Sequence, residues 1–196
     1  DGSSKVLNLN DCHIDFSILK NLVGDIDLLL LQSSSAIWWP CVYDYDDSTK
    51  KRFGEIKRQN ILNRAVQYAK TLNAKNVVPN AGPPILVNEE LKFWNNNRRE
   101  KYNPFILMDD AHKFFIQKGL NSSFFIPGAT ATLQGSNLKT RISNQDVHYI
   151  YNDYESYLNK YQNNFNIQKD TISLKEIQCV VDKFGNQLRK IKKISK

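Results

Sequence analysis

The chain has 196 residues, of which 41% are hydrophobic and 24% charged, and its formal net charge is +7. This length supports one main domain, or one domain with a small appendage, and the longest apolar runs are far too short to span a bilayer. Much of the excess of positive over negative charge lies in a tail at 189–196. Such a tail is more typical of a solvated segment than of a nucleic-acid interface, so neither a membrane nor nucleic acid is an expected partner.

The first part of the chain predicts a strand, a helix and a second strand. Residues 5–10 alternate apolar and polar side chains and lead to Asp11, as a half-buried strand does. Residues 15–24 have helical spacing, with an aspartate as a possible cap and a glycine as a stop. The almost unbroken apolar run at 26–32 is typical of a strand covered on both faces. We expect this strand to be central in the sheet.

A long helix and a third strand are predicted next. Residues 46–72 contain no proline, and their later part places apolar residues on one face. Residues 76–78 form a short strand before a turn rich in proline and glycine at 79–84. Strands alternating with helices in this way indicate an α/β fold.

The later sequence has weaker patterns. It predicts short helices at 89–94 and 109–118, a strand at 122–126 and a turn at 127–130. From about residue 137 the composition shifts toward Asn, Gln, Tyr and Lys, and two amphipathic helices are predicted at 154–165 and 173–191. We therefore expect a main domain at 1–136 and a helical extension with a basic tail at 137–196.

The cysteines give no sign of a disulfide framework. Cys12, Cys41 and Cys179 are odd in number and unevenly spaced. The first five residues lack an initiator Met and the pattern of a signal peptide. These features predict a cytoplasmic protein and indicate a fragment.

Four short segments, in order, resemble one known family. They are Val-Leu-Asn-Leu-Asn-Asp-Cys at 6–12, the Gln-Ser-Ser-Ser-Ala and Trp-Trp-Pro stretch within 28–40, Val-Val-Pro-Asn-Ala-Gly-Pro at 77–83, and Phe-Ile-Pro-Gly-Ala-Thr at 125–130. Together they are similar to the CMP-N-acetylneuraminate hydroxylase-like branch of the metallo-β-lactamase-fold proteins. The resemblance covers about residues 1 to 135.

The resemblance implies a fold and a chemistry. The chain would be the later half of a four-layered αββα sandwich, and Asp11 would help to hold iron or zinc at an edge of the sheets. The implied function is part of a metal-dependent hydroxylase or hydrolase acting on a small-molecule substrate such as a sugar nucleotide. Such a metal needs three or more protein ligands and an open position.

Several parts of that metal site are missing from the sequence. The His-x-His-x-Asp-His cluster of the fold does not occur, and Asn80 stands where many of its hydrolases place a histidine ligand. The paired Cys and His ligands of a Rieske cluster, which can precede this domain in the hydroxylase-like branch, are absent too. We therefore expect an upstream half-domain, a Rieske-type domain or a second copy as a partner, and no catalysis by this chain alone.

The candidate site residues each have a structural alternative. Asp11 either ligates a metal or caps a helix that begins near Ile14, and His13 is a second candidate ligand or a loop residue. Asp109 and His112 are spaced for a metal, although the dipole of a helix start explains the aspartate equally well. The candidate substrate-binding residues, which could equally serve packing or turns, are Ser33, Ser34, Trp38, Trp39, Asn80 and Thr130.

A second function of a different class is compatible with the same sequence. A half-domain without its companion sheet would expose an apolar face, and large apolar surfaces normally associate. The alternative prediction is therefore a non-catalytic interaction module that associates through the uncovered face of its sheet.

Overall fold

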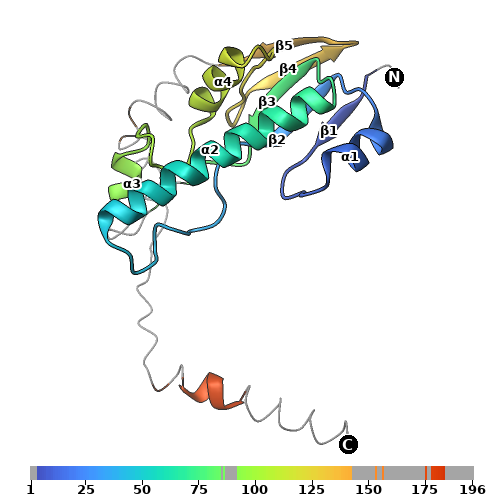
Figure 1. The fold of residues 1–196 in the computed structure, drawn as a ribbon. Helices are drawn as coiled ribbons and strands as arrows, with labels where there is room; N and C mark the ends of the chain where they lie inside the picture. Colours follow the sequence, from blue (N-terminus) through green and yellow to red (C-terminus); the bar gives the residue numbers. More distant parts are fainter. Residues whose placement is uncertain are drawn as a thin grey trace, which may run out of the picture. The chain divides into compact units, whose positions relative to one another are not determined.

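The computed structural model describes residues 4–84, 86, 92–142, 153, 156, 175 and 178–183. The chain divides into two compact units, Asp1–Asp153 and Tyr154–Lys196. Figure 1 shows the helices and strands of the first unit, which contains the candidate site. Within the described ranges, no helix is long and apolar enough to cross a membrane.

A three-stranded parallel sheet lies at the centre of the first unit. It consists of β1 (Val6–Asn8), β2 (Leu28–Gln32) and β3 (Asn76–Asn80), in the order β1-β2-β3. The central position predicted for the second strand is confirmed. The first strand is shorter than expected at both ends. The backbone N–H of Lys5 is bonded to the side chain of Asp27 (2.8 Å), and that of Asn10 is bonded to the side chain of Asn8 (3.0 Å).

Two helices pack with this sheet, and both were predicted. In α1 (Phe16–Val23) the carboxylate of Asp15 accepts hydrogen bonds from the first-turn amides, and α2 (Asp47–Thr71) begins in the same way at Asp46. Figure 1 shows α2 running across one face of the sheet. The main core fills the space between them, and it includes Leu19, Leu29, Leu31, Leu62, Ala65, Ala69, Leu72 and Val77.

Two shorter helices complete this part of the chain. The helix α4 (Met108–Gln117) confirms the prediction for 109–118 and contacts both β3 and α2. The helix α3 (Lys92–Asn96) overlaps the end of the predicted helix at 89–94, whose first three residues lie outside the described part.

The strand predicted at 122–126 is wrong. Ser122 makes a single parallel bridge with Val77, and the chain then leaves the sheet. Ile126, with the partly buried Phe124, packs against Leu107 and Met108 instead. The apolar residues that suggested a strand therefore cover the start of α4. The predicted turn is present at Pro127 and Gly128, and Thr130 begins the next strand.

A β-hairpin that the sequence reading missed follows this turn. Its strands β4 (Thr130–Gln134) and β5 (Asn137–Arg141) pair antiparallel around Gly135 and Ser136. The hydroxyl of Ser136 donates to Asp27 (2.8 Å), and its carbonyl accepts from the side chain of Asn76 (2.8 Å). The domain boundary expected after residue 136 falls inside this hairpin, and the first compact unit extends to Asp153.

The C-terminal unit is described only in part. The helix predicted at 154–165 lies outside the described residues apart from Ser156, which is helical. Of the helix predicted at 173–191, Lys175 and 178–183 are described, and they are helical. Gln178 donates to Asp182 one turn later (3.0 Å).

The three-stranded parallel sheet and its helices agree with an α/β fold, whereas the four-layered αββα sandwich stays a prediction. The alternative interaction module required an uncovered sheet face. Leu28 and Val78 lie on the face opposite the main core, yet they are only 7% and 1% exposed. That face is therefore covered at these two positions.

Candidate functional site

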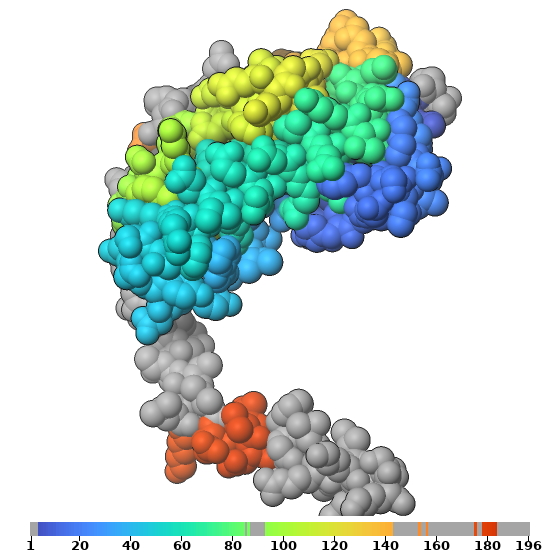
Figure 2. All heavy atoms as spheres, viewed as in Figure 1, coloured from blue at the N-terminus to red at the C-terminus, as the bar shows by residue number. Residues whose placement is uncertain are grey.

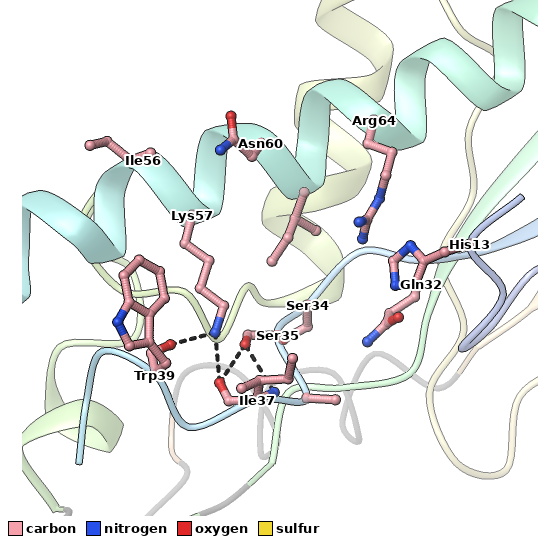
Figure 3. A pocket seen from close by; sticks show the side chains of 12 residues that line it. His13, Gln32, Ser34, Ser35, Ile37, Trp39, Ile56, Lys57, Asn60 and Arg64 are labelled. Carbon is pink, nitrogen blue, oxygen red and sulfur yellow. Dashed lines mark hydrogen bonds between the residues drawn. The ribbon is translucent and has the colours of Figure 1, made fainter. Parts of the chain in front are cut away.

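A cavity of about 250 Å³ lies where the chain leaves β1 and β2, beneath α2. His13 follows β1, Gln32 ends β2, and Ser34 and Ser35 come directly after it. Because carboxyl ends of parallel strands meet at one edge of a sheet, these residues lie together there. Figure 3 shows the lining side chains, which belong to His13, Gln32, Ser34, Ser35, Ala36, Ile37, Trp39, Ile56, Lys57, Asn60, Ile61 and Arg64.

The helix α2 forms one wall of the cavity. Lys57, Asn60 and Arg64 are spaced by three and four residues, so they share one helical face. Figure 3 shows Lys57 reaching down toward Ile37 and Trp39, while Arg64 points toward His13 and Gln32. The helix thus presents one cation to each end of the cavity.

The opposite wall is the segment after β2, and hydrogen bonds fix its course. The backbone N–H of Ser33 donates to the carbonyl of Asn80 (3.2 Å), and that of Ser35 donates to Pro104 (3.0 Å). The hydroxyl of Ser35 donates to the carbonyl of Ile37 (2.7 Å). The three serines at 33–35 are 0%, 1% and 3% exposed, so this segment is as buried as the core.

Hydrogen bonds from Lys57 connect α2 to the segment after β2. Its ammonium donates to the carbonyl of Ile37 (2.7 Å) and to that of Trp39. The same ammonium lies 5.6 Å from the centroid of the Trp39 ring, whose other neighbour is the stacked ring of Phe53 (5.3 Å). Burial lowers the pKa of Lys57 from its ordinary value. The lysine therefore holds a partly desolvated charge at one end of the cavity.

The cavity brings together three of the predicted site residues: His13, Ser34 and Trp39 line it. Ser33, Trp38, Asn80 and Thr130 are not among its lining residues. Ser33 contacts the sulfur of Met108 (3.9 Å), and Trp38 is 43% exposed with its ring edge near Phe105. Thr130 is exposed at the start of the hairpin. Substrate binding by these four residues stays a prediction.

The metal-site candidates Asp11 and His13 are both exposed. Asp15, and not Asp11, caps α1, so the capping alternative for Asp11 is wrong. In the described part of the chain, no three His, Cys, Asp or Glu side chains come together as a metal site. Metal ligation by Asp11 and His13 stays a prediction.

The sequence reading missed the contribution of α2. Only the apolar face of this helix was considered, and Lys57, Asn60 and Arg64 were not singled out. The signal that could have found them is the two cations at seven-residue spacing, which puts both on the face that also carries Ile61. Only the packing of α2 against the strand ends shows that this face meets a cavity.

Three curated proteins are similar to this chain. Two are from Mycobacterium tuberculosis, strains CDC 1551 and H37Rv, and each is 37% identical over 145 residues, which cover 71% of this chain and 28% of the relative. One from Mycolicibacterium smegmatis is also 37% identical over 145 residues, with 27% of its length covered. All three are named Rieske 2Fe-2S iron-sulfur proteins. The chain spans little more than a quarter of these relatives, and no family model or solved structure matches it.

These names overturn the metallo-β-lactamase resemblance. The prediction of the CMP-N-acetylneuraminate hydroxylase-like family is wrong, because the similar proteins are named for an iron-sulfur cluster. The hydroxylase or hydrolase function that this family implied is wrong for the same reason. The motifs that carried the resemblance are short strands with the turns that follow them, and strand ends and turns of this composition occur in many α/β proteins. Of the two metals expected, the relatives' names agree with iron and not with zinc.

The described cysteines and histidines do not fit a Rieske cluster. Such a cluster is held by two cysteines and two histidines. Burial raises the pKa of Cys41 to about 12, although the nearby Lys57 opposes the rise, and a thiol that resists ionisation is a poor ligand for iron. In the described part of the first unit, Cys12 is the other cysteine and His13 and His112 are the histidines, and no three of these side chains come together as a metal site.

Proposed function

We propose that this chain is a small-molecule-binding part of a Rieske-type iron-sulfur protein. The described residues do not hold the cluster in this proposal. The single observation that carries the binding role is the cavity at the carboxyl edge of β1 and β2. Open α/β sheets place their ligands at this edge, because loops that follow the strands can vary without disturbing the core.

The iron-sulfur context is supported by the relatives. Identity of 37% over 145 residues is shared with proteins named for a Rieske cluster. The described cysteines and histidines form no group suited to a metal. In this proposal the part shared with the relatives binds a small molecule, and the iron is bound elsewhere in the same protein or by its partner.

Iron and sulfide analysis tests this division of roles. The 196-residue chain, treated anaerobically with ferrous iron and sulfide, is expected to gain no visible absorption of a [2Fe–2S] centre. A stoichiometric centre that is lost in Cys12→Ser or Cys41→Ser, but kept in Cys179→Ser, would show that the chain holds its own cluster and would overturn the proposal.

A second measurement tests the iron-sulfur context itself. A tag placed on the chain in its native organism should recover iron and acid-labile sulfide, either in the same polypeptide or in a tightly bound partner. Recovery without iron would contradict the Rieske assignment, whatever the cavity binds.

A further inference from the structure

We infer that the cavity beneath α2 is a binding site for a small anion, a molecule with a carboxylate or phosphate group that is held by Arg64 and Lys57. This inference rests on the proposed binding role and names the class of ligand. It concerns only residues of the first compact unit.

The charges that line the cavity all have one sign. Lys57 and Arg64 are cationic, and none of the twelve lining residues is Asp or Glu. A concave site lined by one sign of charge, with low-dielectric walls, concentrates ions of the opposite sign. Anions are therefore the ligands that this cavity favours electrostatically.

Neither cation of the cavity is neutralised by a described carboxylate, in contrast to a neighbour on the same helix. Arg58 lies 3.6 Å from a carboxylate oxygen of Asp110 and donates to the carbonyl of Asn103 (3.1 Å). Among the described residues, Arg64 has no ion pair or hydrogen-bond partner, although it is partly buried. Partly buried charge without a counter-charge is unfavourable, and a bound anion would supply that counter-charge.

Lys57 also has a hydrogen-bond donor that no described residue accepts from. Its ammonium has three donors, and its two acceptors among the described residues are the neutral carbonyls of Ile37 and Trp39. One donor is left for a ligand in the cavity. The positive charge that burial disfavours would be compensated by a negative group at this position.

Ser34 adds a polar group without a partner among the described residues. Its hydroxyl is buried and makes no hydrogen bond to them, and the side chain is among those lining the cavity. Gly82 packs against this side chain, since a Cβ built on Gly82 would lie only 2.6 Å from the Cβ and 2.8 Å from the hydroxyl oxygen of Ser34. A buried hydroxyl without a partner is costly, and a ligand oxygen would satisfy it.

The dimensions of the cavity limit the ligand. Lys57 and Arg64 are seven residues apart, which separates their Cα atoms by roughly 10 Å along a helix axis. The volume of about 250 Å³ is near the lower end of small-molecule sites. Trp39, Ile56 and Ile61 add an apolar wall. A compact acid with a short apolar part fits this combination, whereas a dinucleotide does not.

Titration of the purified chain with three probes tests the inference. Inorganic phosphate and benzoate are the anions, and benzyl alcohol is the uncharged counterpart of benzoate. Binding is followed by tryptophan fluorescence, since Trp39 lies in the wall, and by the NMR signals of arginine side-chain N–H groups. We expect at least one anion to bind, and benzyl alcohol to bind about tenfold more weakly than benzoate. The relative affinity of phosphate and benzoate then identifies the preferred acidic group.

Matched variants locate the binding. Arg64→Gln is expected to weaken anion binding about tenfold, because it removes a charge-assisted hydrogen bond. Arg141→Gln makes the same change on exposed β5, outside the cavity, and should leave the affinity within about twofold. Ser34→Ala is expected to weaken binding less than Arg64→Gln does.

Three results would overturn the inference. They are binding of neither anion, equal losses in Arg64→Gln and Arg141→Gln, and equal affinity for benzoate and benzyl alcohol. If benzoate and benzyl alcohol bound with equal affinity, and Ser34→Ala weakened the binding of both, the proposed small-molecule role would remain intact. The iron and sulfide analysis is independent of all three results.

Discussion

Gly82 and Ser34 lie in such close contact that no side chain larger than hydrogen fits between them. A Cβ on Gly82 would be 2.6 Å from the Cβ and 2.8 Å from the hydroxyl oxygen of Ser34. The backbone of Gly82 also has φ near +142°, a region that L side chains rarely adopt. The turn after β3 and the floor of the cavity are thus coupled through this pair. Figure 2 shows one face of the first compact unit, to which both residues belong, with all heavy atoms as spheres.

The first prediction concerns Gly82→Ala, which is expected to lower the free energy of unfolding by roughly 2 to 5 kcal/mol, combining backbone strain with overpacking. Urea denaturation measures the change. The matched control is Gly128→Ala, where φ is +87° and no atom lies within 4 Å, so only about 1 to 2 kcal/mol is lost. Adding Ser34→Gly to Gly82→Ala should recover the overpacking part. Equal losses at Gly82 and Gly128 would contradict the contact.

Gly54 gives a second prediction, in which two effects of opposite sign compete. Replacement of a mid-helix glycine by alanine ordinarily stabilises a helix by about 1 kcal/mol. At Gly54 of α2, however, the new Cβ would lie 2.0 Å from the carbonyl oxygen of Tyr102. That oxygen belongs to the backbone, so no side-chain rotation relieves the contact.

We therefore expect Gly54→Ala to destabilise the chain by about 2 kcal/mol or more, as measured by thermal or urea unfolding. Asn63→Ala, at an exposed position of the same helix, should be neutral or slightly stabilising. A stabilising Gly54→Ala would show that α2 does not approach Tyr102 this closely.

The elements that the sequence predicted correctly are those whose signals are local. Asp15 and Gly24 delimit α1 because a carboxylate satisfies the first amides of a helix and glycine tolerates the positive φ at its end. The apolar run of β2 requires burial on both faces, which only a central strand provides. Both signals are independent of what packs against them.

The elements that were missed or wrong depend on distant parts of the chain. The hairpin strand β4 is mostly exposed, so its alternation of residues is weak, although Gly135 and Ser136 are a recognised two-residue turn. Its position is fixed by the bond between Ser136 and Asp27, 109 residues apart. The apolar residues at 122–126 could not be assigned to α4 without the fold.

The candidate site likewise contains residues with a local sequence signal and residues whose role depends on the fold. Ser34 and Trp39, which line the cavity, were predicted as substrate-binding residues because polar and aromatic residues after a strand point to the edge where ligands bind. His13, which also lines it, was predicted as a metal ligand beside Asp11. These roles stay predictions. Lys57 and Arg64 were not singled out, because a cation on a long helix is normally solvated and the seven-residue spacing of the two cations does not by itself show that their face meets a cavity. Their charges bear on function only once α2 has packed over the strand ends.

His112 provides a pH-dependent prediction. Its Nδ1 is buried without a hydrogen-bond partner in the part of the chain that the structure describes, and its ring centroid lies 5.4 Å from that of Phe124. Burial lowers the pKa of His112, the charge of Lys113 lowers it further, and Asp109 opposes both. The folded state thus binds a proton at this histidine less readily than the unfolded state does. The resulting stability is fully present above the unfolded pKa of about 6.5 and declines as the pH falls through that value.

Urea denaturation at pH 7.5 and pH 5.5 tests this sign. The chain is expected to have a smaller free energy of unfolding at pH 5.5 than at pH 7.5. In His112→Gln this difference between the two pH values should be measurably smaller. His13→Gln is the matched control, since His13 is exposed. A difference that is unchanged by His112→Gln, or a chain that is more stable at pH 5.5, would contradict the prediction.

The last prediction concerns the ion pair that joins α2 to α4. Arg58 and Asp110 are 3.6 Å apart, with side chains only 10% and 17% exposed, and Arg99 adds a hydrogen bond to Asp110 (2.8 Å). Asp110→Ala removes the counter-charge and leaves a largely buried guanidinium. We expect a loss of about 2 to 3 kcal/mol, somewhat below the 3 to 5 kcal/mol typical of fully buried pairs, since Asp110 keeps some contact with water.

A second variant and a control separate charge from packing. Arg58→Met combined with Asp110→Leu replaces the pair by apolar side chains and should recover most of the lost stability, because no unpaired charge is left buried. Asp25→Ala breaks the exposed pair with Lys20 and should cost much less than Asp110→Ala. If Asp110→Ala cost no more than Asp25→Ala in urea denaturation, the pair would not hold α4 against α2, and the contrast drawn between paired Arg58 and unpaired Arg64 would lose its basis.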